Sequence, residues 1–218
     1  MIFIAGDSWG EGYYQTDPAS GAKWPGFHHY WIKNNQRAVN ISHGGNSNHQ
    51  TLSELQVYLT NKRNHNRLRV IVWLTCVLRD YPTDHDVGDI DHWVYRHYEN
   101  IFDRCTSLAH QHRCTIELLG GLGDIPRLFP HKITDRVQIR LHSVPAFIDN
   151  NYQFEMPYGH ITQVDGIPDM HLKSKLLDQI QPKHEYLTDP NGHFPAGHPG
   201  PIQYSKVFEF LNHVQSKI

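Results

Sequence analysis

Short runs of apolar residues recur along the chain and end at small or polar residues. Four of these runs predict β-strands: Ile2–Ala5, Ala38–Ile41, Arg69–Cys76 and Cys114–Leu119. The third run (RVIVWLTC) is almost uninterrupted, which is typical of a central parallel strand covered on both faces. The stretch VPAFI, which starts at Val144, is a candidate for another strand.

Between and after these runs, apolar residues return every three or four positions, which is the spacing of an amphipathic helix. The predicted helices span residues 24–34, 48–61, 91–112 and 201–218. Strands that alternate with helices in this way form a parallel sheet between layers of helices. The pattern therefore predicts the α/β class, as a three-layer α/β/α sandwich around a central, mainly parallel sheet.

The chain contains no internal repeat, low-complexity tract or linker rich in glycine and serine. We therefore expect its 218 residues to form a single domain, 1–218. The least regular part lies at about 124–189 and is expected to contain an insertion. Within it, YQFEMPYGHITQVDGIP (152–168) is expected to form a long ordered loop.

Composition and charge indicate which kinds of partner and which cellular compartment to expect. The formal net charge is −2, with Lys and Arg scattered, so a nucleic-acid or membrane-surface partner is not expected. No apolar run approaches the roughly 18 residues of a transmembrane helix, and the start of the chain lacks a signal-peptide pattern. These features predict a cytoplasmic location, and they leave the oligomeric state open.

The cysteines and histidines of the chain bear on its redox and metal chemistry. The cysteines are Cys76, Cys105 and Cys114, a sparse and odd set that suggests reduced thiols, although it leaves room for one bridge. The chain has 18 histidines, but neither an HExxH motif nor another convincing ligand spacing is present, and neighbours such as His28 and His29 diverge on a helix. We expect neither a metal site nor a cofactor.

Small and polar residues gather where the predicted strands end. Gly6-Asp7-Ser8 follows the first strand, Ser42–Asn48 the second, Thr75 with Arg79-Asp80 the third and Gly120-Gly121 the fourth, while Gly192–Gly200 precedes the last helix. The carboxyl ends of parallel strands meet at one edge, where ligands bind. These residues are therefore expected to lie together.

This set of residues suits acyl transfer. A serine hydroxyl needs a base to become a nucleophile, and the developing oxyanion needs preorganised N–H donors that glycine lets approach closely. Ser8, His198 and the Gly45 amide could fill these three roles. His193 is a rival for the base, since Asp189 lies only four residues before it.

The same residues carry a family resemblance. GDSWGEG after an amino-terminal strand resembles the first block of the SGNH (GDSL-like) hydrolases, NISHGGNSNHQTL their second block, and HPGPIQYSKVFEFL their His-Pro block before the last helix. The blocks occur in the order of the family. In combination, GDSWG, GGNSN and WLTCVLRD are similar to the GDSL-like proteins of tailed bacteriophages.

The resemblance implies a flavodoxin-like SGNH fold and a serine esterase. It makes Ser8 the nucleophile, Gly45 an oxyanion donor and His198 the general base, with no cofactor. The implied substrate is a small-molecule or glycan ester, with O-acyl groups on a glycan favoured, and the implied location is the host cytoplasm or the virion.

Two departures from the family pattern leave alternatives open. The third block, Gly-x-Asn-Asp, is absent, so the candidates for its oxyanion or substrate contact are Asn46, Asn48, Thr75 and Arg79. The family's aspartate, two or three residues before the histidine, is also absent. The nearest upstream acid is Asp189, which leaves a Ser–His dyad, a triad completed by Asp189 or a backbone carbonyl, or an inactive site.

Simpler interpretations compete with these roles. GGNSN could be a plain turn in which Asn48 caps the following helix, and Arg79-Asp80 could be a surface ion pair. The whole protein could be a catalytically degenerate phage structural or host-interaction protein with the same fold. A metal-dependent hydrolase that uses the abundant histidines is a third hypothesis.

Overall fold

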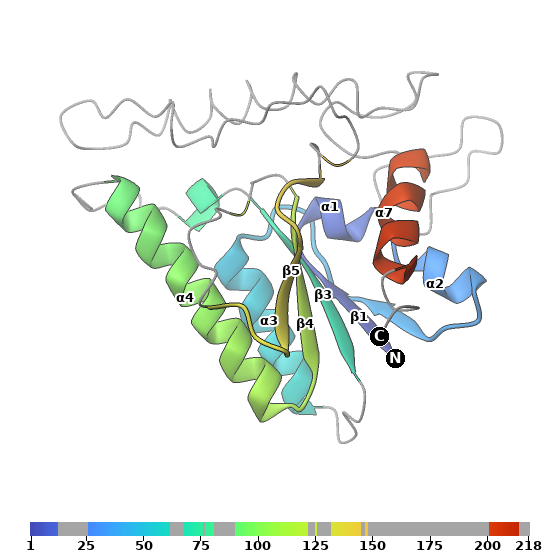
Figure 1. Ribbon diagram of the computed structural model, residues 1–218, viewed down its shortest axis with the longest axis horizontal. Coiled ribbons are helices and arrows are strands. Elements are labelled where there is room, and N and C mark those ends of the chain that lie inside the picture. The colour runs from blue at the N-terminus through green and yellow to red at the C-terminus, as the bar shows by residue number, and fades with distance from the viewer. Residues whose placement is uncertain are drawn as a thin grey trace.

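Five parallel strands form the sheet of the protein in a computed structural model (Figure 1). The structure describes residues 1–12, 26–61, 68–75, 77–80, 90–121, 125, 132–144, 147 and 201–213. The strands are β1 (Ile2–Ala5), β2 (Ala38–Asn40), β3 (Arg69–Leu74), β4 (Thr115–Gly120) and β5 (Val137–Leu141). Their spatial order is β2-β1-β3-β4-β5, and every neighbouring pair is parallel.

Helices cover both faces of this sheet. They are α1 (Ser8–Glu11), α2 (His29–Lys33), α3 (Asn48–Asn61), the 3-10 helix η1 (Val77–Asp80), α4 (Ile90–Gln111) and α7 (Pro201–His213). Figure 1 shows α3 and α4 on one side of the sheet and α2 and α7 on the other. The predicted three-layer α/β/α sandwich is therefore confirmed.

The strand order places a topological switch point between β1 and β3. The chain runs outward from β1 to β2 and then returns to the other side of β1 to form β3. In open parallel sheets, ligands bind beyond the carboxyl ends of the strands that flank such a point. Here β1 leads into α1, and β3 leads through Thr75 towards η1.

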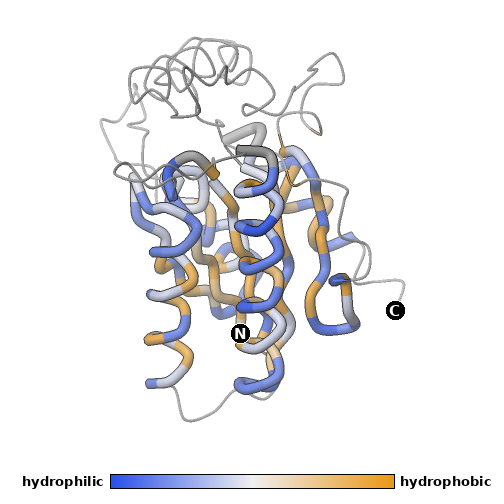
Figure 2. Tube along the Cα trace, turned by 90° about the vertical axis from the view of Figure 1, so that its left-hand side faces the viewer, coloured by the Kyte–Doolittle hydropathy of each residue, from blue (hydrophilic) through white to orange (hydrophobic). Residues whose placement is uncertain are grey.

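The core is aromatic on the side of α2 and α7. The Trp73 ring lies 5.1 Å from that of Phe27 and 5.9 Å from that of Tyr204, measured between centroids. On the opposite face, Phe3 packs edge to face against Tyr58 of α3 at 4.8 Å. In Figure 2 the strands are largely hydrophobic, whereas hydrophilic and hydrophobic residues alternate along the helices. Both helix layers are therefore attached to the sheet by buried apolar contacts.

A buried ion pair links three elements beneath α7. Arg69 donates from Nε and Nη2 to the two carboxylate oxygens of Glu117, each at 2.8 Å, and Nη2 also donates to the Leu211 carbonyl at 2.9 Å. Arg140 Nε lies 3.9 Å from Glu117 Oε2. This fork joins β3, β4 and α7, with β5 beside it.

One strand was not predicted from the sequence. β5 alternates apolar with polar residues (VQIRL), which is the pattern of an edge strand rather than of the continuous runs that marked the other strands. The predicted strand at VPAFI is wrong where the structure describes it, because Val144 and Phe147 are helical and Phe147 N–H donates to the Ser143 carbonyl at 3.2 Å.

Most of the predicted insertion, from 148 onward, lies outside the described residues, and the single domain stays a prediction.

The two described cysteines are buried free thiols. Burial raises the pKa of Cys105 to about 12 and that of Cys114 to about 11, so both stay protonated near neutral pH. Cys76, the third cysteine, lies outside the described residues.

Within the described ranges, no helix combines the length and the apolarity that crossing a membrane requires.

Candidate functional site

Ser8 is the first residue of a short helix that begins directly after β1. Asp7 caps this helix, because its Oδ1 accepts a hydrogen bond from the Trp9 amide at 2.9 Å. Gly12 ends the helix in a left-handed conformation (φ +70°), and its N–H donates to the Ser8 carbonyl at 3.1 Å. Ser8 is 5% exposed. The backbone of Ser8 is thus fixed from both ends of α1.

The glycines of GDSWG allow α1 to lie close to its neighbours. A Cβ at Gly6 would lie 2.7 Å from Trp73 Cβ, and a Cβ at Gly10 would lie 2.6 Å from Ser42 Oγ. Larger residues at either position would displace α1 from β3 or from the segment after β2.

The loop that follows β2 is bonded to both sides of Ser8 in the sequence. His43 N–H donates to the Gly6 carbonyl at 3.1 Å, and Gly44 N–H donates to Glu11 Oε2 at 2.7 Å. The loop closes as a turn in which Asn46 N–H donates to the His43 carbonyl at 3.2 Å. Gly45, at φ +87°, takes the left-handed position of this turn. These bonds bring the loop of residues 41–47, called the Gly45 loop from here on, against the segment that carries Ser8.

Asn48 joins the start of α3 to the end of β3. Its Nδ2 donates to the Thr75 carbonyl at 3.0 Å, and its Oδ1 accepts from Thr75 N–H at 2.8 Å. Both residues are buried, and the Thr75 hydroxyl has no hydrogen-bond partner among the residues that the structure describes. The side chain of Asn48 thus satisfies both backbone groups of Thr75.

The predicted cap of α3 at Asn48 is wrong, because Ser47 occupies that position. Ser47 Oγ accepts from Gln50 N–H at 3.2 Å, and Gln50 Oε1 accepts from Ser47 N–H at 2.8 Å. This reciprocal pair is a capping box.

Arg79 connects the segments that carry Ser8 and Gly45. Its Nη1 lies 3.2 Å from Asp7 Oδ2 and 3.2 Å from the Asn46 carbonyl oxygen. Asp7 is fully buried, whereas the Arg79 side chain is 21% exposed. The side chain of Asn46 donates to Glu54 Oε2 at 3.0 Å.

Asp80 lies in a separate polar cluster. His97 Nε2 is 3.0 Å from its Oδ2, and His49 N–H donates to both carboxylate oxygens at 3.3 Å. Burial would raise the pKa of Asp80, but the nearby side chains of His97 and Ser47, the His97 charge and the His49 amide outweigh burial and lower it. The possible surface ion pair between Arg79 and Asp80 is therefore wrong, because each residue pairs elsewhere.

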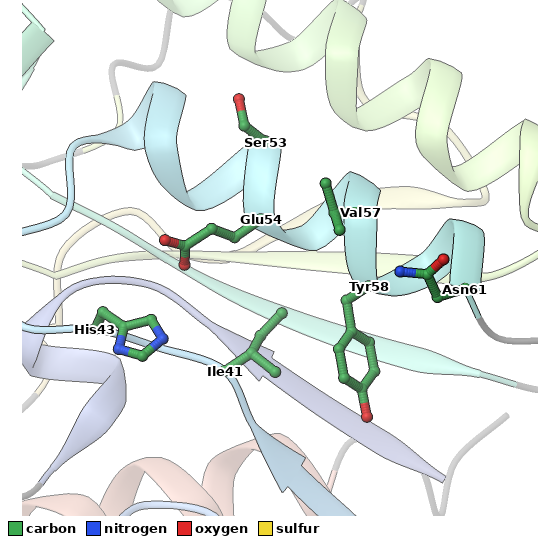
Figure 3. A pocket seen from close by; sticks show the side chains of 7 residues that line it. All are labelled: Ile41, His43, Ser53, Glu54, Val57, Tyr58 and Asn61. Atoms are coloured by element: carbon green, nitrogen blue, oxygen red, sulfur yellow. The ribbon is translucent and has the colours of Figure 1, made fainter.

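An open pocket of about 590 Å³ lies beside this site, between the end of β2 and α3. It is lined by Ile41, His43, Ser53, Glu54, Val57, Tyr58 and Asn61. Figure 3 shows His43 and Glu54 at one end and Tyr58 and Asn61 at the other. Because Glu54 also binds Asn46, the pocket adjoins the Gly45 loop.

Six of the predicted site residues come from the carboxyl ends of β1, β2 and β3. They are Ser8, Gly45, Asn46, Asn48, Thr75 and Arg79. Hydrogen bonds link the segments of all six, but their chemical roles stay predictions. His198, its rival His193 and Asp189 lie outside the described residues.

Sequence reasoning missed several contacts of the site. Asp7 had a usable local signal, since an aspartate directly before a helix is a favoured cap. The pairing of Asp80 with His97 and the contact from Glu11 to Gly44 join residues far apart in the sequence. Such contacts follow from the strand order, which no local pattern specifies.

Comparisons with known proteins give a fold likeness. No protein-family model and no curated protein matches the chain. LAE5, an alpha/beta hydrolase enzyme from the metagenome of Lake Arreo in Spain, is similar in structure with a TM-score of 0.50 and 13% identity, covering 99% of this chain and 94% of that chain. A GDSL-like lipase from Bacteroides thetaiotaomicron has a TM-score of 0.42 and 12% identity, with coverage of 99% and 87%. The psychrotrophic esterase EstA from Pseudoalteromonas sp. has a TM-score of 0.41 and 14% identity, with coverage of 82% and 93%. At these identities, the likeness to LAE5 shows the fold alone.

Proposed function

We propose that this protein is a serine esterase of the SGNH type. Ser8 Oγ attacks the ester carbonyl carbon while His198 takes the hydroxyl proton. The Ser8 and Gly45 amides, with an asparagine side chain, stabilise the oxyanion until the bond to the alcohol breaks and the alcohol takes the proton from His198. Water, activated by His198, then cleaves the acyl-enzyme and releases the carboxylic acid.

The observation that carries this proposal is the placement of Ser8. It begins α1 at the β1/β3 switch point, where open parallel sheets bind ligands. The Gly45 loop is hydrogen-bonded to Gly6 on one side of Ser8 and to Glu11 on the other. The proposed nucleophile and the Gly45 turn therefore lie close together, at the edge where open parallel sheets bind ligands.

The proposed base is supported by the position of α7. Tyr204 in this helix donates its hydroxyl hydrogen to the Trp9 carbonyl at 2.8 Å, next to Ser8 in the sequence. His198 precedes Pro201, the first residue of α7, by three positions. Asp189 is the candidate for the residue that orients the imidazole, and a Ser–His dyad is the alternative.

The proposed substrate class follows from the motif resemblance. The GDSWG, GGNSN and HPGP segments resemble blocks of the SGNH hydrolases, and by that analogy we infer an ester substrate, with O-acyl groups on a glycan favoured. LAE5, whose fold this chain shares, is an alpha/beta hydrolase enzyme, which agrees with a hydrolytic activity in general.

The proposal is tested by hydrolysis of p-nitrophenyl acetate. Ser8→Ala is expected to reduce kcat/KM by at least about 1,000-fold, because the nucleophile is lost. Ser107→Ala, at an exposed position of α4, is the matched control and is expected to keep wild-type activity. Equal activity in Ser8→Ala and the wild type would exclude the serine mechanism.

A second candidate function is a non-catalytic structural or host-interaction protein of a phage. It is favoured by the absence of the Gly-x-Asn-Asp block and of an aspartate close before His198. In that case, folded wild-type protein has no esterase activity, and Ser8→Ala leaves its binding properties intact.

A further inference from the structure

The helix η1 carries two adjacent charged residues that hold the segments around the proposed nucleophile and oxyanion donor. We propose that Arg79 and Asp80 are positioning residues, which set the Gly45 loop against Ser8 without touching the substrate. The inference rests on the proposed function, because the loop and Ser8 are taken to act together in that reaction.

Arg79 acts on the two segments at once through a single nitrogen. Its Nη1 donates to Asp7 Oδ2 and to the Asn46 carbonyl, both at 3.2 Å. Asp7 is fully buried and caps the helix that starts at Ser8, while Asn46 follows Gly45 directly. A buried carboxylate needs a charged partner, so Asp7 holds the guanidinium in place. The guanidinium then fixes the distance between the cap of α1 and the turn.

Asp80 holds the next part of the same loop. Its carboxylate accepts from His49 N–H, in the first turn of α3, and bonds to the side chain of Ser47. A negative charge at the start of a helix is favourable, because the amide groups there point outward. His97 of α4 holds the carboxylate from the other side at 3.0 Å. The end of the Gly45 loop is therefore attached to α4 through Asp80.

The two contacts follow one another along the loop. Arg79 binds at Asn46, and Asp80 binds at Ser47 and His49, so η1 contacts three residues within 46–49. The hydrogen bond that closes the turn, from Asn46 N–H to the His43 carbonyl, lies directly beside these contacts. Releasing either side chain should loosen the turn that places Gly45.

Backbone hydrogen exchange tests the positioning independently of catalysis. In Arg79→Gln, the amides of Gly44 and Asn46, both hydrogen-bonded in the wild type, are expected to exchange at least 10-fold faster. Arg96→Gln removes an exposed arginine of α4 and serves as the matched control, with unchanged exchange at both amides. Unchanged exchange in Arg79→Gln would overturn the inference.

Steady-state kinetics with p-nitrophenyl acetate test the consequence for catalysis. Arg79→Gln is expected to lower kcat by about 10- to 100-fold with KM changed less than threefold, because displaced groups weaken transition-state contacts. Arg79→Lys keeps a positive charge beside Asp7 and is expected to recover at least part of this loss. If KM rises instead and kcat is unchanged, Arg79 contacts the substrate and the positioning role is wrong.

Asp80→Asn tests the second contact with the same two readouts. We expect faster exchange at Asn46 and a fall in kcat of about 10-fold, with KM unchanged. Asp103→Asn, which removes an exposed carboxylate of α4, is the control. Wild-type kcat and wild-type exchange in Asp80→Asn would remove Asp80 from the proposal.

The two readouts separate this inference from the proposed function. If wild-type protein lacks esterase activity, the esterase proposal fails and with it the catalytic consequence drawn here, whatever the exchange shows. If wild-type protein is active and the Arg79 and Asp80 variants match it in kcat and exchange, the inference alone fails. Slower catalysis together with faster loop exchange supports both.

Discussion

Asp80 is a nearly buried carboxylate whose neighbours favour its charged form. Its side chain is 7% exposed, and it faces the His97 imidazole, the Ser47 hydroxyl and the His49 amide. Together these groups lower the pKa of Asp80 from its ordinary value of 3.8, although burial opposes them. The charged form therefore contributes to the stability of the folded protein.

This contribution makes a prediction about pH. A carboxyl group whose pKa is lower in the folded state stabilises the fold at any pH above its pKa in the unfolded state. This contribution is lost as the pH falls through the pKa of the folded state. At pH 7, Asp80→Asn is expected to reduce the free energy of unfolding by about 1–3 kcal/mol. In urea denaturation, the difference from the wild type should shrink below about pH 4. A difference that stays constant between pH 7 and pH 3 would contradict this account, and Asp103→Asn is the control.

At the scale of elements, the side chain of Asn48 bonds the start of α3 to the end of β3. Asn48 satisfies the buried backbone N–H and carbonyl of Thr75, and Ser47 with Gln50 caps the helix just before it. The start of α3, the end of β3 and the Gly45 loop are thereby held as one unit.

Replacing Asn48 by alanine tests this attachment. Both backbone groups of Thr75 would lose their partner in a buried place, so we expect a loss of about 2–4 kcal/mol in the free energy of unfolding. Asn61→Ala, at the exposed end of the same helix, should change it by less than about 0.5 kcal/mol. Equal effects of the two variants in urea denaturation would show that the Asn48 contacts contribute little.

Elements with a strong local pattern were predicted closely from the sequence. α3 has its predicted bounds, because three leucines at helical spacing mark its buried face. β3 and β4 were found from their apolar runs, whereas β5 was missed because an edge strand alternates polar and apolar residues.

The site was predicted only in part, for a related reason. Its residues could be placed at one edge, since the carboxyl ends of parallel strands meet there. Their pairing could not be predicted, since the contact of Arg79 with Asp7 spans 72 residues and depends on β1 and β3 being neighbours.

At the scale of the whole molecule, the buried fork of Arg69 and Glu117 joins the sheet to α7. This helix also donates from Tyr204 to Trp9 beside Ser8, so its placement affects the site. A buried charge without an oppositely charged partner destabilises the fold, because its loss of hydration is not compensated.

Removing one residue of the Arg69–Glu117 pair should therefore lower the free energy of unfolding more than removing both. Glu117→Gln is expected to lower the free energy of unfolding by about 3–5 kcal/mol, since Arg69 and Arg140 would lose their carboxylate. The double variant Arg69→Met with Glu117→Leu should lose less. Glu99→Gln, in a more exposed pair, is the control and should cost at most about 1 kcal/mol. A double variant that is less stable than Glu117→Gln would contradict the pairing.

The central claim, that Ser8 is an activated nucleophile with His198 as its base, is tested most directly by covalent labelling. Folded wild-type protein and His198→Ala would be treated with a fluorophosphonate probe and mapped by peptide mass. The account predicts a stoichiometric adduct on Ser8 in the wild type that is absent from His198→Ala. Folded wild-type protein without an adduct on Ser8 would contradict it.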